Sequence, residues 1–259
     1  APKPSIGFRY LFDTGLLAYI FPAMQQLHGV DIIDGRGHKD NFYHTLEVLD
    51  NVASMSDDLW LRWAAIMHDI AKPATKRFDK RIGWTFHGHE DRGARMVPKI
   101  FAELKLPLND KMKFVQKLVQ LHLRPIVLAQ DIVTDSAVRR LLFEAGDDID
   151  ELMLLCHADV TTKNEFKKRK YRDNFELVKQ KLKDVEARDQ IRNWQPPVSG
   201  EDIMTLFGLG PGRVIGVIKN AMREAILEGE VENNREDALR FVSKKGEEMG
   251  LIRKNNTVL

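Results

Sequence analysis

Apolar residues recur at helical spacing along most of the chain, and few segments alternate as a strand would. Asp57 and Asp58 are suited to cap a helix that continues to Met67 and stops near Pro73. Residues 76–86 have mixed polarity and contain a glycine, so we expect a loop there. Further helices are expected over residues 91–104, 111–124, 136–145, 149–159, 175–191 and 214–226. The pattern predicts an all-α fold.

The stretch Gln-Pro-Pro-Val-Ser-Gly at residues 195–200 is the clearest linker in the sequence. We therefore expect a domain boundary beside it, at residue 193. With 43% hydrophobic residues in 259, the chain has enough apolar material for a sizeable core and is expected to form one or two domains.

Several classes of protein are excluded by composition. A single cysteine, Cys156, excludes an internal disulfide framework. No apolar run reaches the roughly 18–20 residues of a membrane span, and no signal segment is recognisable. We therefore expect a cytoplasmic protein without a membrane partner. The formal net charge of +2 is too small to indicate nucleic-acid binding by itself. Evidence for such binding has to come from local clusters of basic residues.

Four side chains of metal-ligand type lie in apolar, helix-like segments: His44, the adjacent His68 and Asp69, and Asp159. A buried imidazole or carboxylate without a partner costs about 2–7 kcal/mol. A divalent cation would satisfy all four groups at once. Imidazole combined with carboxylate suits Ni, Mn, Co, Fe or Zn better than Ca. The sequence therefore predicts a site for a divalent transition metal, with one or two ions.

The segments that contain these residues resemble the HD-domain superfamily of metal-dependent phosphohydrolases. More closely, they resemble the C-terminal half of bacterial tRNA nucleotidyltransferases, the CCA-adding enzymes and their poly(A) polymerase relatives. The resemblance covers most of the chain and is most specific at residues 61–73 and 86–90, with further pieces at 3–9, 38–46, 138–142 and 158–159. It implies a helical neck remnant at 1–30, an HD-domain helical bundle with the following long helix at 31–192, and a C-terminal helical body at 193–259.

The resemblance also implies roles for further residues. His89 and His122 stand where two-metal members of the superfamily place additional imidazoles. Asp69 would bridge the ions or accept a proton. From their own positions, Lys72, close to the HD pair and followed by Pro73, is a candidate to hold a substrate phosphate, and His87 is a candidate to donate to one. Exposure of His87 to water in a loop is an equally good interpretation.

The catalytic head of the transferases carries a Gly-Gly turn and an Asp-x-Asp pair. By the resemblance it would lie before residue 1. We therefore expect no nucleotidyl transfer from this chain by itself.

A dense basic run with two interleaved aromatic residues follows Asp159; its cations are Lys163, Lys167, Lys168, Arg169, Lys170 and Arg172. It is either a solvated helix face or a patch for RNA backbone, in which Lys167, Lys168 and Arg169 would contact phosphates. Arg139 and Arg140 are weaker phosphate candidates, because pairing with Glu144 on the surface of a helix is the common alternative.

Together these features predict a metal-dependent phosphodiesterase or phosphatase that acts on nucleotides or RNA ends within a tRNA nucleotidyltransferase-like protein of tRNA processing. Its expected partners are tRNA or other RNA and nucleotide phosphoesters. The alternative is a non-catalytic body that binds tRNA for a nucleotidyltransferase head.

Overall fold

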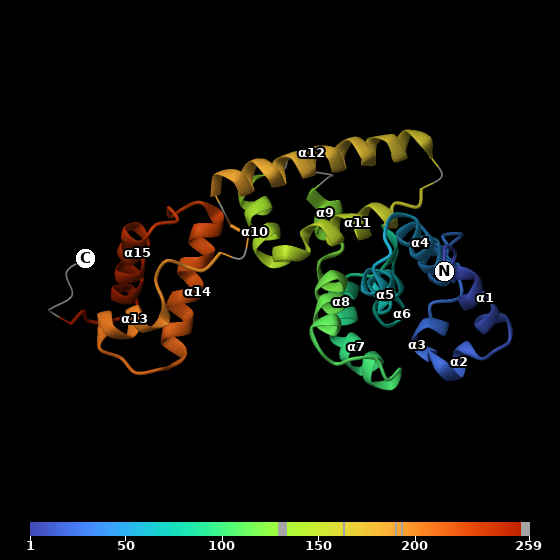
Figure 1. The fold of residues 1–259 in the computed structure, drawn as a ribbon, viewed down its shortest axis with the longest axis horizontal. Coiled ribbons are helices and arrows are strands. Elements are labelled where there is room, and N and C mark those ends of the chain that lie inside the picture. The colour runs from blue at the N-terminus through green and yellow to red at the C-terminus, as the bar shows by residue number, and fades with distance from the viewer. Residues whose placement is uncertain (129–133, 163, 190, 193, 255–259) are drawn as a thin grey trace. The chain divides into compact units, whose positions relative to one another are not determined.

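The computed structural model describes residues 1–128, 134–162, 164–189, 191–192 and 194–254, and these are largely helical (Figure 1). The predicted all-α class is confirmed. The helices are α1 (Ser5–Asp13), α2 (Leu17–Ile20), α3 (Pro22–Gln25), α4 (Asn41–Met55), α5 (Leu59–Met67), α6 (Lys72–Thr75), α7 (His89–Glu103), α8 (Asp110–Leu121), α9 (Arg124–Leu128), α10 (Asp135–Ala145), the 3₁₀ turn η1 (Gly146–Asp148), α11 (Ile149–Asp159), α12 (Glu165–Asp189), α13 (Gly200–Phe207), α14 (Arg213–Glu228) and α15 (Arg235–Glu248).

A small hairpin interrupts the helices. Strands β1 (Arg77–Asp79) and β2 (Gly83–Thr85) pair antiparallel, with Phe78 opposite Trp84. The prediction of a loop over residues 76–86 is therefore wrong at the two strands. Strands of three residues are too short for alternation of polar and apolar positions to be recognised. Gly83 has φ of 97°, which only glycine adopts without strain, and this allows the turn to close.

The chain divides into two compact units. The first comprises Ala1–Asp131 with Asp147–Val178, and the second comprises Ile132–Gly146 with Lys179–Leu259. Helix α12 contributes residues to both. No described helix has the length and apolar character needed to cross a membrane.

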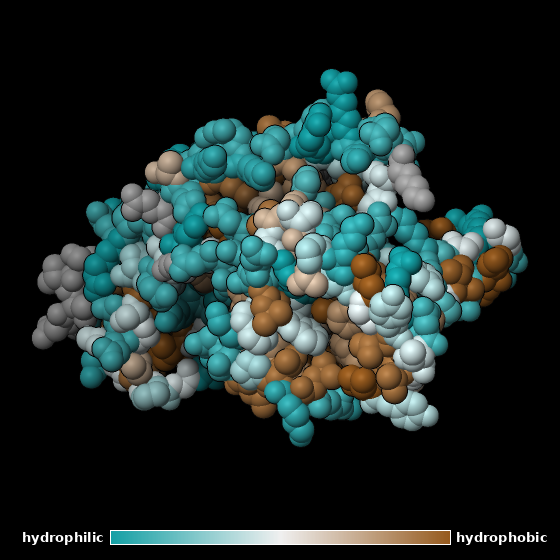
Figure 2. Space-filling model, turned by 45° about the vertical axis from the view of Figure 1, so that its right-hand side comes forward, coloured by the Kyte–Doolittle hydropathy of each residue, from teal (hydrophilic) through white to brown (hydrophobic). Residues whose placement is uncertain are grey.

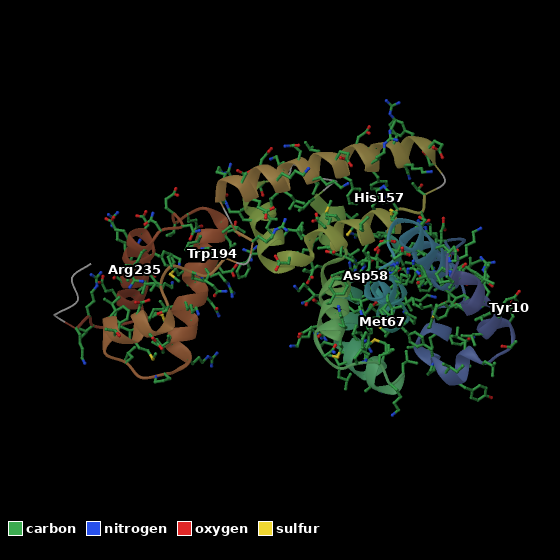
Figure 3. The ribbon with its side chains drawn as sticks, in the orientation of Figure 1. Tyr10, Asp58, Met67, His157, Trp194 and Arg235 are labelled. Atoms are coloured by element: carbon green, nitrogen blue, oxygen red, sulfur yellow. The ribbon has the colours of Figure 1, made fainter. Side chains whose placement is uncertain are left out.

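The core of the first unit lies among α4, α5, α7, α8 and α11. Asp58 caps α5, as predicted, by accepting hydrogen bonds from the backbone N–H groups of Trp60 and Leu61. Met67, at the end of α5, is fully buried inside this bundle (Figure 3). Gly93 on α7 faces Val119 on α8 so closely that a Cβ would lie 3.1 Å from the Val119 side chain. The small residue therefore allows α7 and α8 to pack tightly.

The second unit has its own core, formed where α13, α14 and α15 meet (Figure 1). Ser199 and Asp202 form a capping box that starts α13, because each side chain bonds the other's backbone N–H. The fully buried residues of this core are Val198, Ile203, Ile218, Met222, Ala238 and Val242. This unit carries none of the six predicted metal ligands.

Candidate metal centre

All six predicted metal ligands lie at or beside the ends of helices of the first unit. His44 is in the first turn of α4, and His89 is the first residue of α7. The other four are at C-terminal ends: His68 and Asp69 follow α5, His122 follows α8, and Asp159 is the last residue of α11. The fold brings them together in two sets, each with ligand atoms within 4.8 Å of one another: His44, His68 and Asp159, then Asp69, His89 and His122.

Three of the four imidazoles are oriented by backbone carbonyls. The Nδ1 atoms of His68, His89 and His122 lie 2.7–2.8 Å from the carbonyl oxygens of Ala65, Phe86 and Val119. Carbonyls in the last turn of a helix have no intrahelical partner, so Ala65 and Val119 are free to accept. A carbonyl only accepts, so each Nδ1 carries a hydrogen. In the neutral rings, each Nε2 then presents a bare lone pair.

These lone pairs converge without a donor between them. The Nε2 atom of His89 lies 3.3 Å from Nε2 of His122 and 3.2 Å from Oδ1 of Asp69. The Nε2 atom of His68 is buried and has no hydrogen-bond partner, although it lies 3.2 Å from Oδ2 of Asp69. A cation satisfies such a cluster, either a proton added to an imidazole or a metal ion. The donor set therefore fits the predicted metal.

Asp69 faces both sets of ligands. Its Oδ2 atom is 3.2 Å from Nε2 of His68 and 3.5 Å from Nε2 of His44, whereas its Oδ1 atom points to His89. The side chain is 2% exposed. Lys72 also contacts it, with Nζ 2.6 Å from Oδ2. The carboxylate therefore has the geometry to bridge two cations.

Charge is concentrated strongly in this small volume. Burial alone would lower the pKa of His68, but the carboxylates of Asp69 and Asp159 outweigh it and raise this pKa to about 10 in the metal-free protein. Burial lowers the pKa of His122 to about 4, and the charge of His68 contributes in the same direction. His122 is therefore neutral near pH 7, as a metal-binding imidazole has to be.

Burial would raise the pKa of Asp69, yet the positive charges of His68 and Lys72 hold it well below its usual range. Hydrogen bonds from His44 and His68 likewise outweigh burial and lower the pKa of Asp159. Both carboxylates are consequently anionic, and they supply the negative charge that a divalent cation requires.

His44 is held differently from the other imidazoles. Its Nε2 atom lies 2.9 Å from Oδ1 of Asp159, and its Nδ1 atom lies 3.1 Å from the hydroxyl Oγ1 of Thr161. The same hydroxyl accepts a hydrogen bond of 3.0 Å from Nζ of Lys39. Sequence reasoning missed Thr161 and Lys39. The only available signal was the position of a hydroxyl residue two places after Asp159.

His87 is exposed and belongs to neither set of ligand atoms. Lys72 contacts Asp69 and is partly buried. Its Nζ atom also lies 5.5 Å from the centroid of the Phe86 ring. The left-handed backbone of Gly88, with φ of 74°, separates His87 from His89 at the start of α7. Of Lys72 and His87, the two phosphate contacts predicted near the HD pair, Lys72 is the one that contacts a predicted ligand, Asp69.

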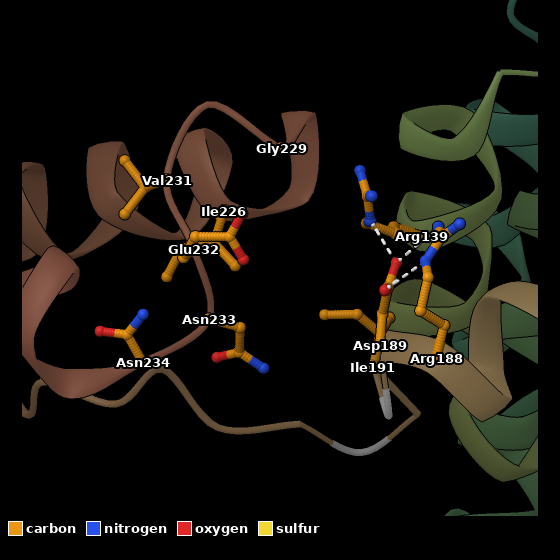
Figure 4. A pocket seen from close by; sticks show the side chains of 10 residues that line it. All are labelled: Arg139, Arg188, Asp189, Ile191, Ile226, Gly229, Val231, Glu232, Asn233 and Asn234. Carbon is orange, nitrogen blue, oxygen red and sulfur yellow. Dashed lines mark hydrogen bonds and ion pairs between the residues drawn. The ribbon is translucent and has the colours of Figure 1, made fainter.

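Arg139 and Arg140 belong to the second unit and are engaged by acidic residues of that unit. Arg139 donates to Asp189 over 2.7 Å at the edge of a cavity of about 480 Å³, where Arg188 contacts the same carboxylate (Figure 4). Arg140 donates to Glu224 and Glu228, each over 2.6 Å. The expected alternative was pairing with Glu144, so ion pairing is present but with other partners.

The predicted phosphate contacts in the basic run, Lys167, Lys168 and Arg169, are exposed on the first turns of α12. Helix α12 presents a mostly hydrophilic surface, at the top of Figures 1 and 2. Lys168 and Arg169 line a cavity of about 420 Å³ together with Tyr171 and Phe175. Lys163 lies outside the described residues. In the sequence, these three cations follow the candidate ligand Asp159 closely.

Comparison with known proteins identifies the HD domain family, which matches residues 41–164. The A-adding tRNA nucleotidyltransferase of Deinococcus radiodurans is 32% identical over 256 residues, which are 96% of this chain and 56% of that protein. The CC-adding tRNA nucleotidyltransferase of Thermus thermophilus is 29% identical over 253 residues, 93% of this chain and 53% of that protein. The Multifunctional CCA protein of Shewanella frigidimarina is 29% identical over 178 residues, 65% of this chain and 41% of that protein. The chain spans about half the length of the curated relatives it matches.

Proposed function

We propose that this chain, which has an HD domain at residues 41–164 and is homologous to tRNA nucleotidyltransferases over nearly its whole length, is a metal-dependent phosphohydrolase of tRNA processing. Its substrates would be phosphoesters of nucleotides or of RNA ends. The observation that carries the proposal is the convergence of bare Nε2 lone pairs and carboxylate oxygens in a buried cluster, which a divalent cation satisfies.

We assign two cation positions to the two sets of ligand atoms. His44, His68 and Asp159 would hold one ion, and His89 and His122 the other, with Asp69 bridging both. Nitrogen and oxygen donors together favour Ni, Mn, Co, Fe or Zn. Bound there, a divalent cation supplies Lewis acidity to a phosphoryl group and to water.

The protein side chains then have separate tasks. Asp69 is better suited to bridge than to accept a proton, because the depressed pKa of its carboxyl makes it a weak base. Lys72, which contacts Asp69, would stand beside a cation held by that carboxylate, and its ammonium would neutralise a phosphoryl oxygen there. His87, exposed on the loop before α7, stays a candidate donor to the leaving oxygen.

The test combines metal content with turnover. Purified protein is loaded with Mn, Ni or Co, its metal stoichiometry is measured by elemental analysis, and a panel of phosphomonoesters, cyclic nucleotides and RNA ends is assayed. We expect hydrolysis that His68→Ala abolishes together with metal binding. If wild-type protein turns over none of these substrates faster than His68→Ala does, the proposed hydrolase activity is refuted.

A second candidate function is that of a tRNA-binding body. The observation in its favour is the exposed basic run at the start of α12, where Lys168 and Arg169 share a cavity with two aromatic rings. Ammonium and guanidinium groups neutralise backbone phosphates, and aromatic faces stack on bases.

The test is a filter-binding titration with tRNA at several salt concentrations. Reversing Lys167, Lys168 and Arg169 to Glu should weaken binding and flatten its dependence on salt. The matched control reverses three exposed lysines on α7 and α8 of the same unit: Lys99, Lys111 and Lys113. Equal losses in the two triple variants would assign the effect to overall charge, and the run would be a solvated face.

A further inference from the structure

The partner of His44 differs in chemistry from the partners of the other three imidazoles. His68, His89 and His122 each face a backbone carbonyl, which only accepts hydrogen bonds. His44 faces the hydroxyl of Thr161, which can both donate and accept. The reason is positional. His44 lies in the first turn of α4, where the free backbone groups are N–H groups and no carbonyl is available to it.

The Thr161 hydroxyl can form a hydrogen bond with Nδ1 of His44 whether the ring hydrogen is on Nε2 or on Nδ1. Without metal, Nε2 carries the hydrogen and donates to Asp159 over 2.9 Å, while the Thr161 hydroxyl donates to Nδ1. With metal, Nε2 has to offer its lone pair, so the hydrogen moves to Nδ1 and the same hydroxyl accepts from it. A carbonyl at this position would fail in the first state, since it has no hydrogen to give.

Lys39 fixes the orientation of that hydroxyl. Its ammonium has no acceptor capacity and therefore donates to Oγ1 of Thr161, over 3.0 Å. This contact occupies one of the two oxygen lone pairs. The other lone pair and the hydroxyl hydrogen remain for His44, which needs one or the other according to its state.

We propose that Thr161, oriented by Lys39, is a positioning residue of the metal centre that lets His44 exchange its bond to Asp159 for a metal ion. This role rests on the metal centre of the proposed function. At the other three imidazoles a backbone carbonyl already holds a hydrogen on Nδ1, whereas at His44 the hydrogen has to move from Nε2 to Nδ1 before Nε2 can bind metal.

The experiment measures metal affinity by competition with a chromophoric chelator. Thr161→Val removes the hydroxyl but keeps the shape of the side chain, and we expect affinity to fall by about 10- to 100-fold, as for other losses of partners behind metal ligands. Thr161→Ser keeps the hydroxyl and should restore affinity. The matched control is Thr162→Val, because the Thr162 hydroxyl accepts from the backbone N–H of Asn164.

Nitrogen-15 NMR of the histidine rings supplies a readout independent of activity. On addition of metal, His44 should change from the Nε2–H to the Nδ1–H form, whereas His89 and His122 keep Nδ1–H. Equal metal affinity of wild type and Thr161→Val, or an unchanged His44 ring, would overturn the role of Thr161 alone. A wild-type protein that binds no metal would overturn the metal centre itself, and this role with it.

Discussion

Replacing His122 by Leu should have opposite consequences in the absence and presence of metal. His122 is 1% exposed, so leucine, of similar size, can occupy its space. In the metal-free protein the variant loses the hydrogen bond from Nδ1 to the Val119 carbonyl, which is worth about 1 kcal/mol. It also removes a bare lone pair 3.3 Å from that of His89. These effects oppose each other, so the free energy of unfolding should change little.

With metal the balance is different. An ion held by the native state alone stabilises it by about 4 kcal/mol when its free concentration is 1,000 times the dissociation constant. His122→Leu removes one donor of the Asp69, His89 and His122 set, so most of this contribution should disappear. At about 2–4 °C per kcal/mol for a domain of this size, the expected loss in melting temperature is roughly 8–16 °C.

The assay compares melting temperatures of wild type and variant, each in excess chelator and in excess Mn or Ni, together with metal stoichiometry. The variant should bind one ion fewer per chain. His157→Leu is the control, since His157 is an exposed residue of α11 outside both ligand sets. The same change in melting temperature with chelator and with metal would refute the reasoning.

Two further predictions concern the second unit. Gly246→Ala should destabilise it, because the new Cβ would lie 2.7 Å from ring carbons of buried Phe207, an overpacking of about 1–3 kcal/mol that exceeds the helix-propensity gain. Gly216→Ala, on α14 with open space at its Cβ, should instead stabilise the unit by up to about 1 kcal/mol. Urea unfolding of both variants measures these changes in the free energy of unfolding. Asp202→Asn should cost about 1 kcal/mol at pH 7. Bonds from Arg235 and then the capping serine lower the pKa of Asp202, so its contribution is present above the unfolded-state pKa near 4 and is lost as pH falls below that value. A penalty that persists unchanged at low pH would contradict this.

The sequence predicted the helices well where apolar residues are periodic and poorly where they are not. Helices α10 and α11 begin and end within one residue of expectation. The predicted helix over 175–191 instead starts at Glu165, because its first ten residues are mostly charged and have no apolar stripe. Periodicity also could not show that α10 packs against α14 in the second unit, since an apolar stripe does not specify its partner.

The candidate site was predictable to the extent that motifs specify it. His68 with Asp69 stands out because charged groups are unusual in apolar segments. The Gly-His-Glu piece that contains His89 stands out by its resemblance to the HD-domain superfamily. Thr161 and Lys39 carry no such signal. Their contact joins residues more than 100 positions apart in the sequence, and only the fold shows it.

The position of the six predicted ligands at helix ends has a consequence for how the first unit opens. Helices α4, α5, α7, α8 and α11 each contribute at least one ligand, so separating any one of them from the rest removes a donor from the cluster. With cations bound, partial openings that release single helices become as unfavourable as opening the whole bundle. Amide hydrogen exchange at these five helix ends should therefore become uniformly slow with metal and vary from helix to helix without it.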